Sequence, residues 1–154
     1  MTRRSPQRAN TYRTTQATLA SIADVWIEFA NPAGSGIRAE FRIELMQTAS
    51  YCTLKRNTSA HTGGNSAATV NIPMASDMPP ATITGKRYTV AQTGGGAGAL
   101  ELGRIFLAAT SPTTEHAPLT DAAPPTLLPG DWLVLVMSAT GNTTGFVEWT
   151  ETSL

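Results

Sequence analysis

Residues 37–45 alternate without a break between apolar and charged side chains. Apolar residues fill the odd positions, and the even positions carry Arg38, Glu40, Arg42 and Glu44. A period of two sends successive side chains to opposite faces, so the segment predicts a half-buried β-strand and not a helix. The charges alternate in sign along the outer face. We therefore interpret that face as solvated surface and not as a binding site.

Further strand signals recur along the chain. They lie at residues 22–30, 51–56, 68–72, 82–90, 99–109, 132–137 and 145–150. Clusters of Gly and Pro separate them, and five of the ten prolines fall within residues 111–130, which predicts a long surface loop there. About eight short strands without a helical period predict an all-β, single-domain β-sandwich, with a jelly roll as the expected architecture.

The first part of the chain has a different character. Residues 1–16 are polar and basic and have no apolar period, so we predict an extended N-terminal arm there and the sandwich domain at residues 17–154. The chain has 11 basic and 11 acidic residues, and the first acid is Asp24. The arm therefore concentrates positive charge on an otherwise mildly acidic body. Its basic residues are Arg3, Arg4, Arg8 and Arg13.

Three interpretations of this arm remain open. It lies across a partner subunit, it is a frayed terminus, or it binds nucleic acid. The third is the least favoured, because Tyr12 is the only aromatic residue in the arm on which a base could stack. Under the first interpretation the four arginines are partner-binding residues.

Trp26 is a second candidate for partner binding. If Val25, Ile27 and Phe29 face the core, the alternation turns Trp26 outward between Asp24 and Glu28. An exposed tryptophan is typical of a protein interface. We assign the other two tryptophans to the core.

Few residues offer catalytic or metal-binding chemistry. His61 and His116 are the only histidines; both fall in polar stretches that we interpret as exposed loops, and neither has metal-ligand spacing. Glu148 and Glu151 are three residues apart, so in a strand they point to opposite faces and make a poor acid–base pair. We therefore expect no catalytic residue, no metal, no cofactor and no enzymatic activity.

Cys52 is the only cysteine, so it cannot form a disulfide within the chain, and we interpret it as a buried apolar residue. No segment approaches the roughly 18 apolar residues of a membrane helix, and the start of the chain lacks an apolar signal region. We expect no membrane partner, and synthesis in a reducing cytoplasm.

Three phrases carry a resemblance to a known group of proteins. They are FANPAGSG at residues 29–36, LKRNTS at residues 54–59 with two glycines soon after, and LPGDWL at residues 128–133 followed by GFVEWTE at residues 145–151. This order resembles small structural proteins encoded among the head genes of tailed bacteriophages and prophages. Some of these are capsid decoration (cement) proteins, and others form head spikes or fibres.

The resemblance implies a virion structural protein, made in the host cytoplasm, whose β-sandwich assembles on an icosahedral shell, often as a trimer. The expected partners are the major capsid protein and further copies of the chain, and nucleic acid is not an expected partner. The alternative is a head-fibre or spike base, or a tail-associated adhesin, that binds a host surface glycan. A small hydrolase or lyase that uses His61 or His116 is the least favoured interpretation.

Overall fold

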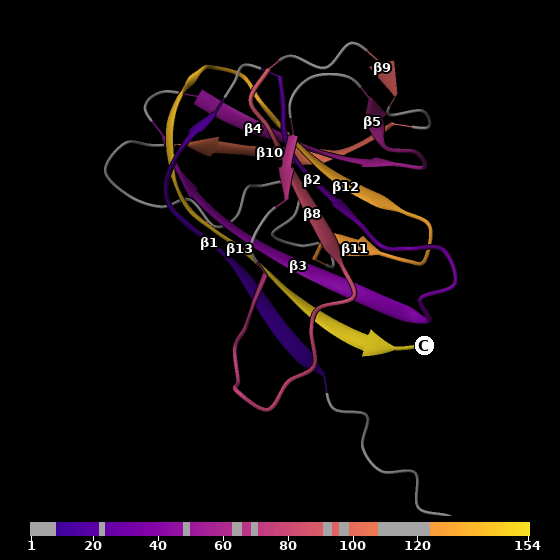
Figure 1. The fold of residues 1–154 in the computed structure, drawn as a ribbon. Helices are drawn as coiled ribbons and strands as arrows, with labels where there is room; N and C mark the ends of the chain where they lie inside the picture. Colours follow the sequence, from indigo (N-terminus) through magenta and orange to yellow (C-terminus); the bar gives the residue numbers. More distant parts are fainter. Residues whose placement is uncertain are drawn as a thin grey trace, which may run out of the picture.

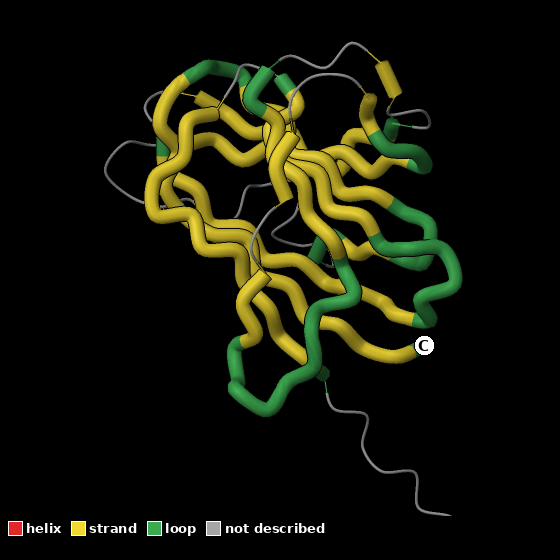
Figure 2. Tube along the Cα trace, in the orientation of Figure 1, coloured by secondary structure: helices red, strands yellow, loops and turns green. Residues whose placement is uncertain are grey.

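All regular elements of the described chain are β-strands (Figures 1 and 2). The computed structural model describes residues 9–21, 24–47, 50–62, 66–68, 71–90, 94–95, 99–107 and 124–154. Two sheets pack face to face. In order, one sheet contains β11 (Thr126–Leu127), β3 (Ile37–Met46), β13 (Gly141–Ser153), β1 (Asn10–Ser21) and β7 (Asn71–Pro73). The other contains β10 (Leu100–Leu107), β4 (Ser50–Asn57), β12 (Trp132–Met137), β2 (Val25–Ala30), β8 (Thr84–Tyr88) and β6 (Ser66–Ala68). A small third sheet pairs β5 (His61–Thr62) with β9 (Gly94–Gly95).

The strand order confirms the predicted jelly roll. Its eight strands are β1, β2, β3, β4, β10, β11, β12 and β13. Numbered one to eight along the chain, they lie in the order 1-8-3-6 in one sheet and 2-7-4-5 in the other, which is the double Greek key of a jelly roll. The segment between β4 and β10 adds β6 and β8 to one sheet, β7 to the other, and the small β5–β9 sheet.

Part of the predicted arm belongs to the sandwich domain. Residues 10–16 belong to β1, which pairs with β13 from Asn10–Glu151 onward, so the prediction of an arm over residues 1–16 is wrong for this part. Tyr12 and Thr14 face the core. A strand whose inward residues include threonine has a weak apolar period, and this hid β1 in the sequence. Residues 1–8, and with them Arg3, Arg4 and Arg8, lie outside the described residues.

The alternation of residues 37–45 is confirmed, because Ala39, Phe41, Ile43 and Leu45 are buried on one face of β3. The predicted strand at residues 68–72 contributes instead to two strands, β6 and β7, that lie in different sheets. Strand prediction therefore succeeded where one face is apolar throughout and failed where the chain crosses between sheets.

An aromatic cluster centred on Trp149 fills the space between the sheets. Its ring centroid lies 5.9 Å from that of Tyr12, 5.9 Å from Phe41 and 5.5 Å from Phe29. Tyr12, Phe41 and Trp149 come from the five-stranded sheet, whereas Phe29 comes from the six-stranded sheet. These contacts join the two layers through large apolar surfaces that are almost completely buried.

A buried carboxylate next to this cluster fastens the loop that leads into β8. Glu151 is 4 % exposed, and its carboxylate accepts hydrogen bonds from the backbone amides of Thr82 and Ile83 and from the indole of Trp149, at 2.9 to 3.1 Å. The Tyr12 hydroxyl donates to the Pro79 carbonyl at 2.9 Å in the same region. Several donors compensate the desolvation of the Glu151 carboxylate.

Trp26 is fully buried, so the prediction that it faces outward is wrong. The cause is a β-bulge: Ile27 pairs with Leu135 and Val25 pairs with Val136, which leaves Trp26 as the extra residue. The bulge breaks the alternation and places Trp26 in the same core cluster as Ile27. An interface role for Trp26 has no support from its position.

Asn31 joins two of the motifs that carry the resemblance. Its side-chain amide donates to the carbonyls of Ile37 at 2.8 Å and Leu127 at 3.3 Å. Its backbone exchanges hydrogen bonds with the LPGD turn, where the Gly130 amide donates to the Asn31 carbonyl at 2.8 Å. The NPAGSG and LPGD turns therefore lie together at one end of the sandwich, and their buried polar residue has a structural role.

The backbone of Gly145 lies close against that of the neighbouring strand β3. Its φ is +143°, and a Cβ there would lie 2.0 Å from the carbonyl oxygen of Glu44. We expect Gly145→Ala to lower the free energy of unfolding by roughly 2–4 kcal/mol through strain and overpacking. Gly34→Ala is the control, because Gly34 has a φ of +79° but no atom within 4 Å of the added Cβ; it should cost only about 1 kcal/mol. Urea unfolding measures both, and equal losses would contradict the close approach.

Candidate binding face

The predicted partner-binding residues that the structure describes do not come together. Arg13 lies on the outer face of β1, where its guanidinium forms an ion pair with Glu148 at 2.6 Å. Its guanidinium carbon also lies 3.8 Å from the centroid of the Phe146 ring. Trp26, by contrast, is inside the core. Arg13 is therefore part of the domain's own surface network and not of a free arm.

On the outer face of the five-stranded sheet, arginines form ion pairs with glutamates of the same sheet. The ion pairs are Arg13–Glu148, Arg38–Glu40 and Arg42–Glu44. Strand register places Arg13, Glu148 and Arg42 in one row across three strands, so opposite charges are neighbours. The arrangement agrees with the interpretation of the alternating charges on β3 as surface.

The outer face of the six-stranded sheet differs where β4 pairs with the edge strand β10. Tyr51 and Phe106 are direct cross-strand partners with ring centroids 6.2 Å apart, and they are 37 % and 65 % exposed. The Arg104 guanidinium lies 5.3 Å from the Tyr51 ring centroid and is held by Glu101 at 2.9 Å. Lys55 lies directly across from Glu101 in the next row of the ladder. We call these five residues the aromatic–cationic face.

Hydrogen bonding fixes the orientation of Arg104 on this face. The hydrogen bonds that the guanidinium donates to Glu101, followed by the charge of Glu101, raise the pKa of Arg104, so the guanidinium stays charged. An open hollow runs along β10 beside it, lined by Glu101, Leu102, Gly103, Arg104 and Phe106. An exposed aromatic pair with a positioned arginine has the composition that is enriched in protein interfaces.

The sequence predicted the two strands but not this face. Because Ile105 and Leu107 are in the core, a period of two turns Phe106 outward. In the same way, the buried Cys52 indicates that its neighbour Tyr51 points outward. That signal was available in each strand alone. The pairing of β4 with β10 joins segments about fifty residues apart, and only tertiary structure brings the two rings into contact.

His61 is not an exposed loop residue, so that prediction is wrong. Its side chain is 15 % exposed, and its Nδ1 lies 2.7 Å from the buried Glu28 carboxylate. Glu28 also accepts hydrogen bonds from the His61 amide at 3.1 Å and the Tyr88 hydroxyl at 3.2 Å. Burial, followed by the charge of Glu28, raises the pKa of Tyr88 to about 12. The three groups hold β5 against the outer face of β2 and β8.

The remaining reactive groups are separated. Burial raises the pKa of the Cys52 thiol to about 12, so Cys52 is a protonated core residue. Glu148 and Glu151 point to opposite faces of β13, as predicted. Within the described residues no three His, Cys, Asp or Glu side chains gather as a metal site. The described residues also include no helix long and apolar enough to span a membrane.

Comparisons with protein-family models, curated proteins and solved structures find no match to this chain.

The contacts of Glu28 with His61 and Tyr88 predict a large stability loss for one variant and a small loss for another. Glu28→Ala leaves the His61 and Tyr88 donors without their buried acceptor, and we expect a loss of roughly 3 kcal/mol or more in the free energy of unfolding. Tyr88→Phe removes one donor and leaves the His61–Glu28 contact in place, so the expected loss is about 1 kcal/mol. Urea unfolding at one pH measures both variants. A neutral Glu28→Ala would show that the cluster does not fasten β5.

The burial and the raised pKa of Cys52 predict that its thiol is unreactive in the folded protein. At pH 8 the folded protein should not react with a disulfide reagent such as Ellman's reagent, because both the burial and the missing thiolate prevent attack. The same protein in denaturing urea should release one equivalent of chromophore, because Cys52 is the only cysteine. Stoichiometric reaction of the folded protein would contradict the assignment of Cys52 to the core.

Proposed function

We propose that this chain is a capsid decoration (cement) protein, a virion structural protein that binds the outside of an assembled icosahedral phage shell. The order of the NPAGSG, LPGD and EWTE motifs supports the phage assignment. The observation that carries a binding role is the exposed Tyr51–Phe106 pair with Arg104 on the outside of the β4–β10 edge. The histidine and the thiol that the structure describes have contacts within the fold, since His61 lies against the Glu28 carboxylate and Cys52 is buried in the core.

The physical basis of such a role is the free energy of association. A subunit that binds the assembled shell and not its separated parts stabilises the shell by mass action. Such a subunit contacts neighbouring copies of the major capsid protein and associates with itself as a trimer. Several weak contacts that act together then give a high overall affinity. The arginines among residues 1–8, which are Arg3, Arg4 and Arg8, suit acidic patches on a partner through bidentate pairing.

A second candidate is a head-fibre or spike base, or a tail-associated adhesin, that binds a host glycan. The exposed rings of Tyr51 and Phe106 favour it, because sugar rings stack on exposed aromatic side chains. Copy number separates the two functions. We expect hundreds of copies per virion by quantitative gel densitometry of the purified phage whose genome encodes the chain. A dozen or fewer copies would favour the fibre or tail function.

Because β1 begins at Asn10, two truncations can separate a binding role of residues 1–8 from the stability of the domain. A chain that lacks residues 1–8 keeps every paired residue of β1, so we expect an unchanged melting temperature and weaker co-sedimentation with shells purified without this protein. A chain that lacks residues 1–13 also loses Tyr12 and Arg13, and we expect it to be destabilised. Unchanged shell affinity after removal of residues 1–8 would reject a binding role for the arm.

A further inference from the structure

We infer that the aromatic–cationic face is a docking surface for a protein segment that presents carboxylates beside apolar side chains. This inference rests on the proposed function and adds the location and the chemistry of one contact with the shell. It concerns Tyr51, Lys55, Glu101, Arg104 and Phe106, which are all on β4 and β10.

The first argument is exposure on a rigid support. Phe106 is 65 % exposed although the residues on either side of it, Ile105 and Leu107, are buried in the core. The backbone below Phe106 is therefore fixed by the sandwich, and the ring has little freedom to withdraw from water. Tyr51 is the ladder partner of Phe106 and enlarges the same apolar surface. Burial of such a pair by a partner is favourable, and it costs little conformational entropy because the strands are already ordered.

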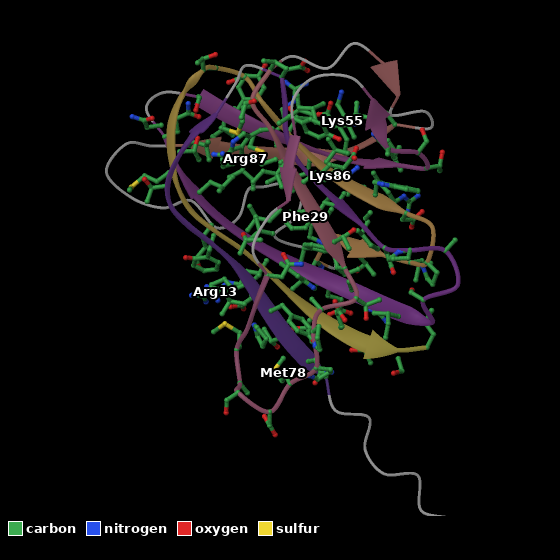
Figure 3. All side chains as sticks on the ribbon, viewed as in Figure 1. Arg13, Phe29, Lys55, Met78, Lys86 and Arg87 are labelled. Carbon is green, nitrogen blue, oxygen red and sulfur yellow. The ribbon has the colours of Figure 1, made fainter. Side chains whose placement is uncertain are left out.

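The second argument is charge. Among the outward-facing residues of β4 and β10, Lys55 and Arg104 are cations and Glu101 is the acid, so the face has a net positive charge. Along the Lys55 row, register places Val134, Glu28 and then Lys86 on the same side of the sheet. Figure 3 labels Lys55 and Lys86 at the two ends of this row. Glu28 is buried and engaged with His61, whereas Lys86 is exposed. Arg104 pairs with Glu101, as the arginines of the opposite sheet pair with their own acids, so Lys55 and Lys86 supply the excess positive charge. Charge complementarity therefore favours a partner with carboxylates at this face.

The third argument separates a protein from a sugar. A sugar ring stacks on a flat and open aromatic surface, but the planes of Tyr51 and Phe106 meet at 57°. The Arg104 guanidinium also covers one side of the Tyr51 ring. The Arg104 guanidinium already donates hydrogen bonds to one carboxylate, that of Glu101, and arginine next to aromatic residues is the typical composition of an interaction hot spot. The geometry suits an acidic protein segment better than a glycan.

Three variants with a matched control test this inference in the full-length protein. Phe106→Ala removes the apolar contact, and Arg104→Gln and Lys55→Gln remove the charges singly. The control is Arg38→Gln, which removes an equally exposed arginine from the opposite sheet. The assay is co-sedimentation with shells of the encoding phage that were purified without this protein. We expect Phe106→Ala and Arg104→Gln to weaken shell binding by at least about tenfold and Lys55→Gln by a few-fold. Arg38→Gln should bind like the wild type, and all four variants should keep their melting temperature.

Salt and glycan arrays complete the test. Shell binding by the wild type should weaken as salt rises, and the salt dependence should be smaller for Arg104→Gln. Wild-type affinity in all three variants would overturn the inference and leave the proposed function intact. Failure of the wild type itself to bind shells would overturn the proposed function, and the inference with it. Binding of the wild type on a glycan array that is lost in Phe106→Ala would assign the face to a sugar and also overturn the inference.

Discussion

Trp149 contacts aromatic rings from both sheets, and the packing of the two layers of the sandwich depends on that contact. Its neighbours Tyr12 and Phe41 flank it within the five-stranded sheet, while Phe29 reaches it from across the sandwich. The central strand β13 supplies Trp149, and it pairs with β1 on one side and β3 on the other. Because interiors pack at the density of crystals, this cluster fixes both the distance between the layers and the register of the strands that contribute to it.

Two buried carboxylates extend this order to the segment between β4 and β10. Glu151 binds the amides of Thr82 and Ile83 and so ties the entry of β8 to the five-stranded sheet. Glu28 binds His61 and Tyr88 and so ties β5 to the six-stranded sheet. In each case a charge removed from water receives several donors, which is the condition under which a buried carboxylate is tolerated. The chain therefore uses ionisable residues, which in sequence suggest surface or catalysis, to anchor an inserted segment.

The two outer faces of the sandwich have different physical character, and this difference supports the proposed role. On one face Arg13, Arg38 and Arg42 pair with glutamates of the same sheet. The other exposes Phe106 and Tyr51 next to Arg104 and Lys55 at the edge strand β10. A subunit that must bind one partner benefits from such an asymmetry, because the exposed aromatic pair lies on one side of the sandwich only.

Local patterns in the sequence determined the all-β class, the alternation of residues 37–45, the turns and the opposite orientation of Glu148 and Glu151. These features depend on neighbours one to four positions away, so a single chain segment contains the whole signal. Tertiary structure alone decided that residues 10–16 form a strand between β13 and β7, that a bulge buries Trp26, and that His61 reaches Glu28. It also brought Phe106 beside Tyr51. Each of these depends on hydrogen-bond register or side-chain contact between distant segments, and the energy of such pairings is absent from any one segment.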